Sequence, residues 1–123
     1  MRKWKLNVLH LSHTDIGYTD TQERILSNHI NYIRDIVEAY KKDQKPFENW
    51  KWICESFFAV EQFLENATDE QRKIFNEMID KKILSLSASY LNINELANAN
   101  LYGSILDKIK KLLMKIIERW IQQ

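Results

Sequence analysis

Short segments with the side-chain alternation of β-strands are interleaved along this chain with longer segments that have the apolar spacing of α-helices. Strands are predicted over residues 3–12, 50–54 and 83–87 from alternating or aromatic-rich runs. Helices are predicted from about residue 21 to 42, around 57–64, from 69 to about 80, and over 105–121. Strands that alternate with helices pair in parallel through right-handed crossovers. The sequence therefore predicts an α/β fold, with a short parallel sheet of about three strands and flanking helices.

Two of the predicted helices follow sequences that resemble capping boxes, in which side chains bond the free N–H groups of the first turn. Asp20 with Glu23 precedes the first predicted helix, and Thr68 with Gln71 precedes the third. We expect both helices to begin at these residues.

The chain has 123 residues, with two glycines and one proline against average usage of about 7% and 5%. So few turn-forming residues favour long helices and argue against an all-β fold. A complete (β/α) barrel needs roughly 200 residues or more, which excludes a whole one. Three parallel strands leave edges and faces that need cover. We therefore expect the chain to be part of something larger or half of an oligomer.

The charge balance argues against a nucleic-acid partner, because 18 basic and 17 acidic residues give a net charge of +1. No apolar run approaches the roughly 18 residues of a membrane-spanning helix. Asn7, His10 and His13 interrupt the N-terminal apolar stretch, so it does not resemble a signal peptide. Cys54 is the single cysteine, which excludes an intramolecular disulfide and suits a reducing compartment. A soluble, cytoplasmic protein is expected.

Polar and ionisable residues follow each predicted strand. His13 and Asp15 follow the first strand, Glu55 follows the second, and Asn94 and Glu95 follow the third. Ligands gather at the carboxyl ends of parallel strands, and residues two apart on a strand point the same way. Imidazole and carboxylate are ordinary zinc ligands, so His13 and Asp15 are candidate metal ligands. The alternative is that strand ends lead into loops, which are polar in any case.

Three segments carry a resemblance to a known family. Residues 8–18 read Val-Leu-His-Leu-Ser-His-Thr-Asp-Ile-Gly-Tyr, which resembles the opening motif of the glycoside hydrolase family 38 alpha-mannosidases. Residues 52–58, Trp-Ile-Cys-Glu-Ser-Phe-Phe, resemble the family's second-strand motif, and residues 89–95 stand where its third motif lies. The resemblance covers roughly residues 5–100. It implies that residues 1–123 are the N-terminal portion of a glycoside hydrolase (β/α)-barrel domain, and that this domain is incomplete.

The resemblance also implies residue roles and a cofactor. His13 and Asp15 fall on metal ligands of the family, so zinc or another divalent metal is expected. A carbohydrate substrate is implied, with Tyr18, Trp52, Glu55 and Glu95 as substrate-binding residues. Tyr18, Trp50 and Trp52 could offer aromatic faces for sugar stacking, with an ordinary place in the core as the alternative.

One departure bears on activity. Asn94 stands at the family's nucleophile position, and an amide cannot form the covalent glycosyl ester of a retaining mechanism. The family's remaining histidine ligand corresponds to a position beyond residue 123. We therefore expect a fragment of a metal-dependent glycoside hydrolase that is inactive alone.

The C-terminal segment offers an alternative function. Residues 105–121 form a broad apolar stripe with lysines off it, wider than three strands need. This stripe predicts packing against the missing remainder of the barrel, or self-association through residues 105–121. The alternative is therefore a noncatalytic small α/β module that assembles through this amphipathic helix.

Overall fold

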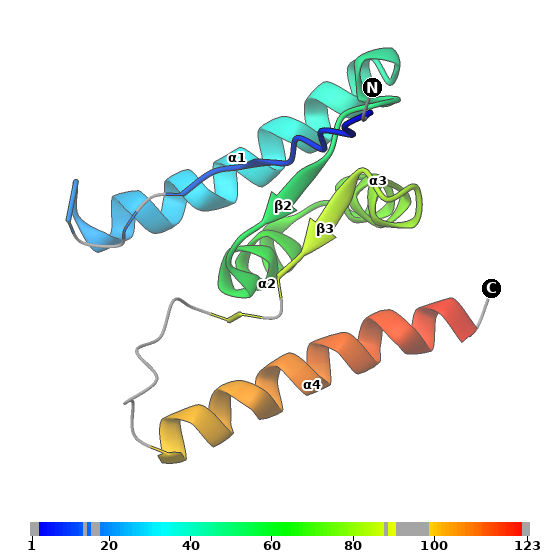
Figure 1. Cartoon of the computed structure of the whole chain (residues 1–123). Coiled ribbons are helices and arrows are strands. Elements are labelled where there is room, and N and C mark those ends of the chain that lie inside the picture. The colour runs from blue at the N-terminus through cyan, green and yellow to red at the C-terminus, as the bar shows by residue number, and fades with distance from the viewer. Residues whose placement is uncertain (1–2, 14, 16–17, 88, 91–98, 122–123) are drawn as a thin grey trace.

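The computed structural model describes residues 3–13, 15, 18–87, 89–90 and 99–121, and its order of elements is strand, helix, strand, two helices, strand, helix (Figure 1). The strands are β1 (His10–Leu11), β2 (Trp52–Cys54) and β3 (Leu84–Leu86). The helices are α1 (Gln22–Lys42), the short 3-10 helix η1 (Lys45–Phe47), α2 (Phe57–Asn66), α3 (Asp69–Asp80) and α4 (Ala99–Ile121). None of the helices in these ranges is long and apolar enough to cross a membrane.

The three strands form one parallel sheet in the order β1-β2-β3. His10 lies opposite Trp52, which lies opposite Leu84, and Leu11, Ile53 and Ser85 form the next row. This confirms the predicted α/β class and the short three-stranded parallel sheet. The first strand is shorter than predicted, because residues 3–9 are extended but lie outside the ladder.

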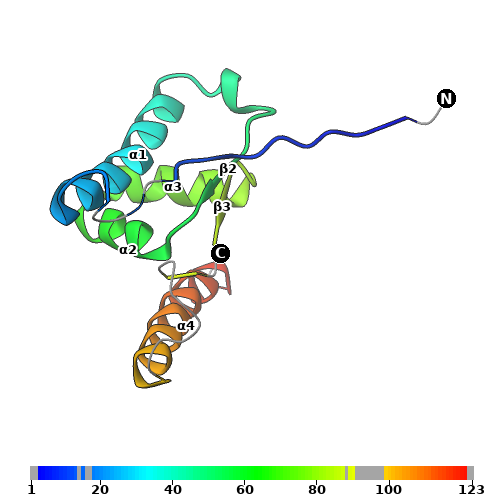
Figure 2. The ribbon, with the colours of Figure 1, turned by 60° about the vertical axis from the view of Figure 1, so that its left-hand side comes forward.

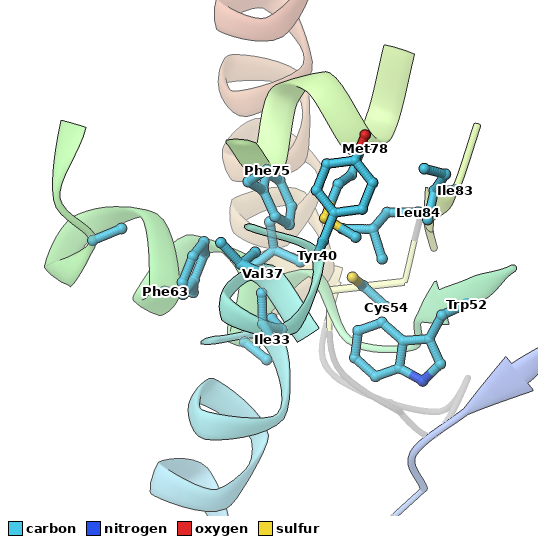
Figure 3. Close-up of a cluster of buried hydrophobic side chains, with 13 residues drawn as sticks. Ile33, Val37, Tyr40, Trp52, Cys54, Phe63, Phe75, Met78, Ile83 and Leu84 are labelled. Carbon is cyan, nitrogen blue, oxygen red and sulfur yellow. The ribbon is translucent and has the colours of Figure 1, made fainter. Parts of the chain in front are cut away.

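One face of the sheet is covered by helices. α1 packs against both α2 and α3, so these three helices form a single layer. Figure 3 shows the side chains of this layer converging on Trp52, Cys54 and Leu84 from the strands. The buried cluster joins α1 (Ile33, Val37, Tyr40), α2 (Ala59, Val60, Phe63), α3 (Phe75, Met78) and the strand residues, with Ala67 and Ile83 between elements.

The opposite face of the sheet is more open. Side chains alternate along a strand, so Leu11, Ile53 and Ser85 point away from the helix layer. Leu11 is 51% exposed, Ser85 is exposed and Ile53 is half-buried. Parallel sheets are ordinarily covered on both faces. The sheet of this chain is therefore covered on one face by α1, α2 and α3, with apolar side chains still accessible on the other.

The ends of α1 and α3 differ from each other in how they are capped. Thr68 accepts the Gln71 N–H and the Gln71 side chain accepts the Thr68 N–H, which confirms the capping box predicted for α3. The box predicted for α1 is wrong, since the helix is capped at Thr21 without a side-chain cap. Asp20 instead accepts a hydrogen bond from the Thr21 N–H and pairs with Arg24 at 3.1 Å. Its carboxylate therefore bonds the residue directly after it and not an N–H group inside the helix.

The end of α3 is a Schellman motif, in which two hydrogen bonds close the helix around a left-handed residue. The Ile83 N–H donates to the Met78 carbonyl and the Lys82 N–H donates to the Ile79 carbonyl, both at 2.9 Å. Lys82 has φ 57°, the left-handed conformation that glycine adopts without cost. The tight turn delivers Ile83 and Leu84 into the core directly after the helix.

We expect Lys82→Gly to stabilise the chain by about 0.5 kcal/mol. Removing the Cβ relieves a left-handed cost of roughly 1 kcal/mol, and the added freedom of the unfolded chain offsets part of that gain. Urea denaturation of Lys82→Gly beside Lys82→Ala isolates the Cβ, because both variants lose the same lysine. Equal midpoints for the two variants would contradict a strained backbone at this position.

α4 is helical over Ala99–Ile121, which confirms the predicted C-terminal helix and extends it at its start. Ile109 is buried against Phe57 and Tyr90, whereas Tyr102 is 45% and Leu106 is 53% exposed. Among the stripe residues whose side chains the structure describes, Ile109 is therefore buried and Leu106 is exposed. The side chains of Leu112, Leu113, Ile116, Ile117, Trp120 and Ile121 lie outside the described residues.

Candidate metal centre

Two of the predicted site residues come from neighbouring strands. His13 follows β1 and Glu55 follows β2 directly, and the two strands run parallel in adjacent positions. Their carboxyl ends therefore meet at one edge of the sheet, where the residues that follow them can come together. Asp15 belongs to the same chain segment as His13.

The imidazole of His13 lies between two carboxylates. Its Nδ1 is 2.6 Å from Glu55 Oε1, and its Nε2 is 3.3 Å from Asp15 Oδ1. The side chains of His13 and Asp15 are 51% and 62% exposed, and that of Glu55 is 26% exposed. The structure therefore brings together the three residues that the sequence placed after the first and second strands.

The hydrogen bond from His13 to Glu55 and the charge of Glu55 raise the pKa of His13 above its usual value. Burial opposes the increase, and Asp15 raises this pKa further by a smaller amount than Glu55 does. Since the pKa is raised, the protonated imidazole is favoured, and the attraction to both carboxylates weakens as the pH rises through that pKa.

The two sides of the imidazole suit different tasks. Two ligand atoms about 2.05 Å from one ion at tetrahedral angles lie about 3.3 Å apart, as His13 Nε2 and Asp15 Oδ1 do. Metal-binding histidines commonly donate their other ring N–H to a carboxylate, which fixes the ring. Glu55 on Nδ1 is placed for that supporting role.

Two ligand atoms are fewer than the three protein ligands of ordinary catalytic zinc sites. Within the described ranges, no group of three or more His, Cys, Asp or Glu side chains is arranged to hold a metal ion. Glu55 contacts the opposite nitrogen from Asp15, so these three residues offer a pair of ligands and a support.

The other predicted residues are placed as follows. Tyr18 is 91% exposed, so its ring is open to solvent. Trp52 is 5% exposed and packs in the core, because it shares the helix-facing row of the sheet with Leu84. The structure thus corrects the expectation that Trp52 contacts substrate, since no face of its ring is available for stacking. Asn94 and Glu95 lie outside the described residues.

Tyr90, which no sequence motif indicated, holds the segment that follows β3 in place. The backbone carbonyl of Tyr90 accepts hydrogen bonds from Ser56 Oγ at 2.9 Å and from the Phe58 N–H at 3.1 Å. Its hydroxyl bonds Glu61 of α2 and Lys108 of α4. Tyr90 therefore ties the segment that follows β3 to the start of α2, next to Glu55. The sequence signal is the serine that directly precedes an apolar helical run, a pattern that is also typical of a helix cap.

We expect Glu55→Gln to lower the pKa of His13 toward its ordinary value, because it removes the largest cause of the increase. Asp15→Asn should lower the pKa of His13 less. NMR titration of the imidazole protons measures both effects, with His29 on α1 as an internal reference. A His13 pKa that Glu55→Gln leaves unchanged would show that the 2.6 Å contact does not form in solution.

Cys54, which directly precedes Glu55, is 2% exposed and lies in the core. Burial raises the pKa of its thiol to about 12, so the reactive thiolate is absent near neutral pH.

Comparisons with known proteins add no assignment to this geometry: no protein-family model, curated protein or solved structure matches the chain.

Proposed function

We propose that this chain forms the first three βα units of a metal-dependent glycoside hydrolase barrel that resembles the alpha-mannosidases. The strand order β1-β2-β3 supports the proposal, because successive strands of a (β/α) barrel lie side by side in chain order. Helices on one face and partly exposed apolar side chains on the other match the outer and inner faces of a barrel wall. Doubly wound folds instead reverse their strand order and place helices on both faces.

The observation that carries the proposed activity is the placement of His13 between Asp15 and Glu55. In this proposal, His13 Nε2 and Asp15 bind a divalent ion, zinc by preference, while Glu55 holds the imidazole through Nδ1. A bound ion of this kind would orient sugar hydroxyls and stabilise developing charge. Tyr18, with its exposed ring, is available to contact a sugar.

The residues of the chain limit what the proposed site can do. Asn94 replaces the carboxylate that would attack the anomeric carbon, so a retaining double displacement has no nucleophile at that position. We therefore propose that the chain binds metal weakly, contacts carbohydrate and does not by itself turn over an aryl α-mannoside. The buried free thiol of Cys54 supports the proposed cytoplasmic location.

Saturation-transfer NMR with methyl α-mannoside tests the carbohydrate part of the proposal. We expect a signal that increases on addition of Zn²⁺ and is lost in Asp15→Asn. Asp35→Asn, the same change at an exposed position of α1, should behave as wild type. No signal in the presence of Zn²⁺, or a signal that Asp15→Asn leaves intact, would contradict carbohydrate binding at this site.

A second candidate function is a noncatalytic α/β module that assembles through α4. The observation in its favour is that Tyr102 and Leu106, one turn apart, remain largely exposed on an amphipathic helix. In this case Leu106→Lys should change the oligomeric state of the chain, and the substitutions at His13 and Asp15 should not.

A further inference from the structure

The extended segment of residues 3–9, here called the N-terminal arm, projects beyond the sheet. Figure 2 shows it running straight into β1 from outside the helical body. Leu6 is 88% exposed, and Val8 and Leu9 are 61% and 54% exposed. An extended segment that exposes several neighbouring apolar side chains is typical of a strand that pairs with another protein surface.

In the part of the chain that the structure describes, no strand pairs with the arm. The ladder between β1 and β2 covers His10 and Leu11, and β2 begins at Trp52. Before β2 the chain turns into η1 (Lys45–Phe47), so it does not continue alongside the arm. Among the described residues, β1 and β3 are the edges of the sheet.

The directions of the backbone N–H and C=O groups distinguish the two edges of the arm. The His10 N–H donates to the Lys51 carbonyl, so even-numbered residues of this extended segment direct their backbone groups toward β2. Odd-numbered residues direct theirs to the outer side. Lys5 and Asn7 therefore present N–H and C=O groups along the outer edge, where a further strand can add.

We propose that two copies of this chain associate by antiparallel pairing of their arms around a two-fold axis at Leu6. In this register each Leu6 faces the Leu6 of the second copy, and Trp4 faces Val8 on the same side. Lys5 and Asn7 exchange hydrogen bonds across the axis, as their outward backbone groups require. Aromatic and β-branched residues opposite one another are a favourable cross-strand pair.

The side-chain pattern of the arm selects this register, because only centring on Leu6 places Trp4, Leu6 and Val8 opposite one another. A pairing centred on Lys5 would place two lysines directly opposite one another, which is destabilising. Centring on Leu6 puts Lys5 opposite Asn7 and Lys3 opposite Leu9, so no lysine directly faces another. The interface is self-complementary, as a two-fold contact requires, which favours a second copy over an unrelated strand. It rests on the arm and β1, and does not depend on the proposed metal site.

Sedimentation velocity of the full chain tests the proposal with two matched substitutions. Leu6→Lys and Leu106→Lys make the same change at exposed positions of the arm and of α4. We expect a concentration-dependent dimer for the wild type and for Leu106→Lys, and a monomer for Leu6→Lys. Circular dichroism should show unchanged folding in Leu6→Lys, because its side chain lies outside the packed core.

Disulfide trapping tests the register itself. Residues on the two-fold axis in a non-hydrogen-bonded pair lie about 4.5 Å apart at Cα, within reach of a disulfide. Leu6→Cys should therefore give roughly tenfold or more cross-linked dimer than Asn7→Cys, because pairing raises the effective concentration of the aligned thiols. The native thiol of Cys54 is buried and does not compete.

The proposal is overturned by a monomeric wild type, by a dimer that persists in Leu6→Lys, or by equal cross-linking at residues 6 and 7. Loss of the dimer in Leu106→Lys but not in Leu6→Lys would assign the interface to α4 instead.

Discussion

Phe63→Ala should remove a large part of the free energy of unfolding of the chain. The Phe63 side chain has no exposed surface and lies 5.4 Å from the ring of Phe75, centroid to centroid, where α2 meets α3. Replacing a buried phenylalanine by alanine costs about 3–5 kcal/mol, which approaches the whole stability of a small domain. Urea denaturation followed by far-ultraviolet circular dichroism measures the loss.

Phe58→Ala is the matched control for Phe63→Ala. Phe58 lies on the same helix but is only partly buried, and its ring contacts Tyr90 rather than the main core. It should lose distinctly less stability than Phe63→Ala. Equal losses for the two variants would mean that the core between the helices and the sheet is not packed as described.

His13→Gln should abolish measurable Zn²⁺ binding by the chain. The substitution removes the imidazole whose Nε2 lies 3.3 Å from Asp15, and leaves one carboxylate for the ion. Glu55→Gln should weaken binding by about 10–100-fold, the usual effect of removing a carboxylate that orients a metal-bound histidine. Isothermal titration calorimetry measures both variants against the wild type.

His29→Gln is the control for nonspecific binding by imidazole, since His29 lies on α1 with its ring edge-on to Tyr32. It should retain wild-type affinity. If His13→Gln left the Zn²⁺ affinity unchanged, or if His29→Gln lowered it equally, the proposed metal site would be contradicted.

Local patterns account for the parts of the fold that could be predicted. The core face of α1 follows from helical spacing, because Ile33, Val37 and Tyr40 recur at intervals of three or four residues. The start of α3 follows from Thr68 and Gln71, whose reciprocal hydrogen bonds involve residues three apart. The box of Asp20 and Glu23 was equally local but wrong, because Asp20 accepts the Thr21 N–H and pairs with Arg24 instead.

Structural features that depend on residues distant in sequence were harder to predict. The ladder of β1 is only two residues long because β2 is short, which the alternation of residues 3–12 does not reveal. Trp52 faces the helices because of its place in the register with Leu84. From the sequence, an aromatic residue before Glu55 is more typical of a core but compatible with a sugar-binding surface, and the orientation of β2 decides between them.

The candidate site combines both situations. The rule that parallel strands end at one edge placed His13 and Glu55 together, although 42 residues separate them. That rule did not specify which nitrogen of His13 each carboxylate would face, because this depends on the ring orientation. In the proposed site, Glu55 faces Nδ1 and supports His13.

Zn²⁺ titration of the chain labelled with ¹⁵N in the histidine ring tests whether His13 binds metal. We expect added Zn²⁺ to shift the His13 Nε2 resonance to that of a metal-bound nitrogen, while Nδ1 stays protonated and hydrogen-bonded to Glu55. Asp15→Asn should greatly weaken this shift. A titration that leaves His13 unchanged, or that places the metal on Nδ1 and displaces Glu55, would contradict the proposed metal-dependent site.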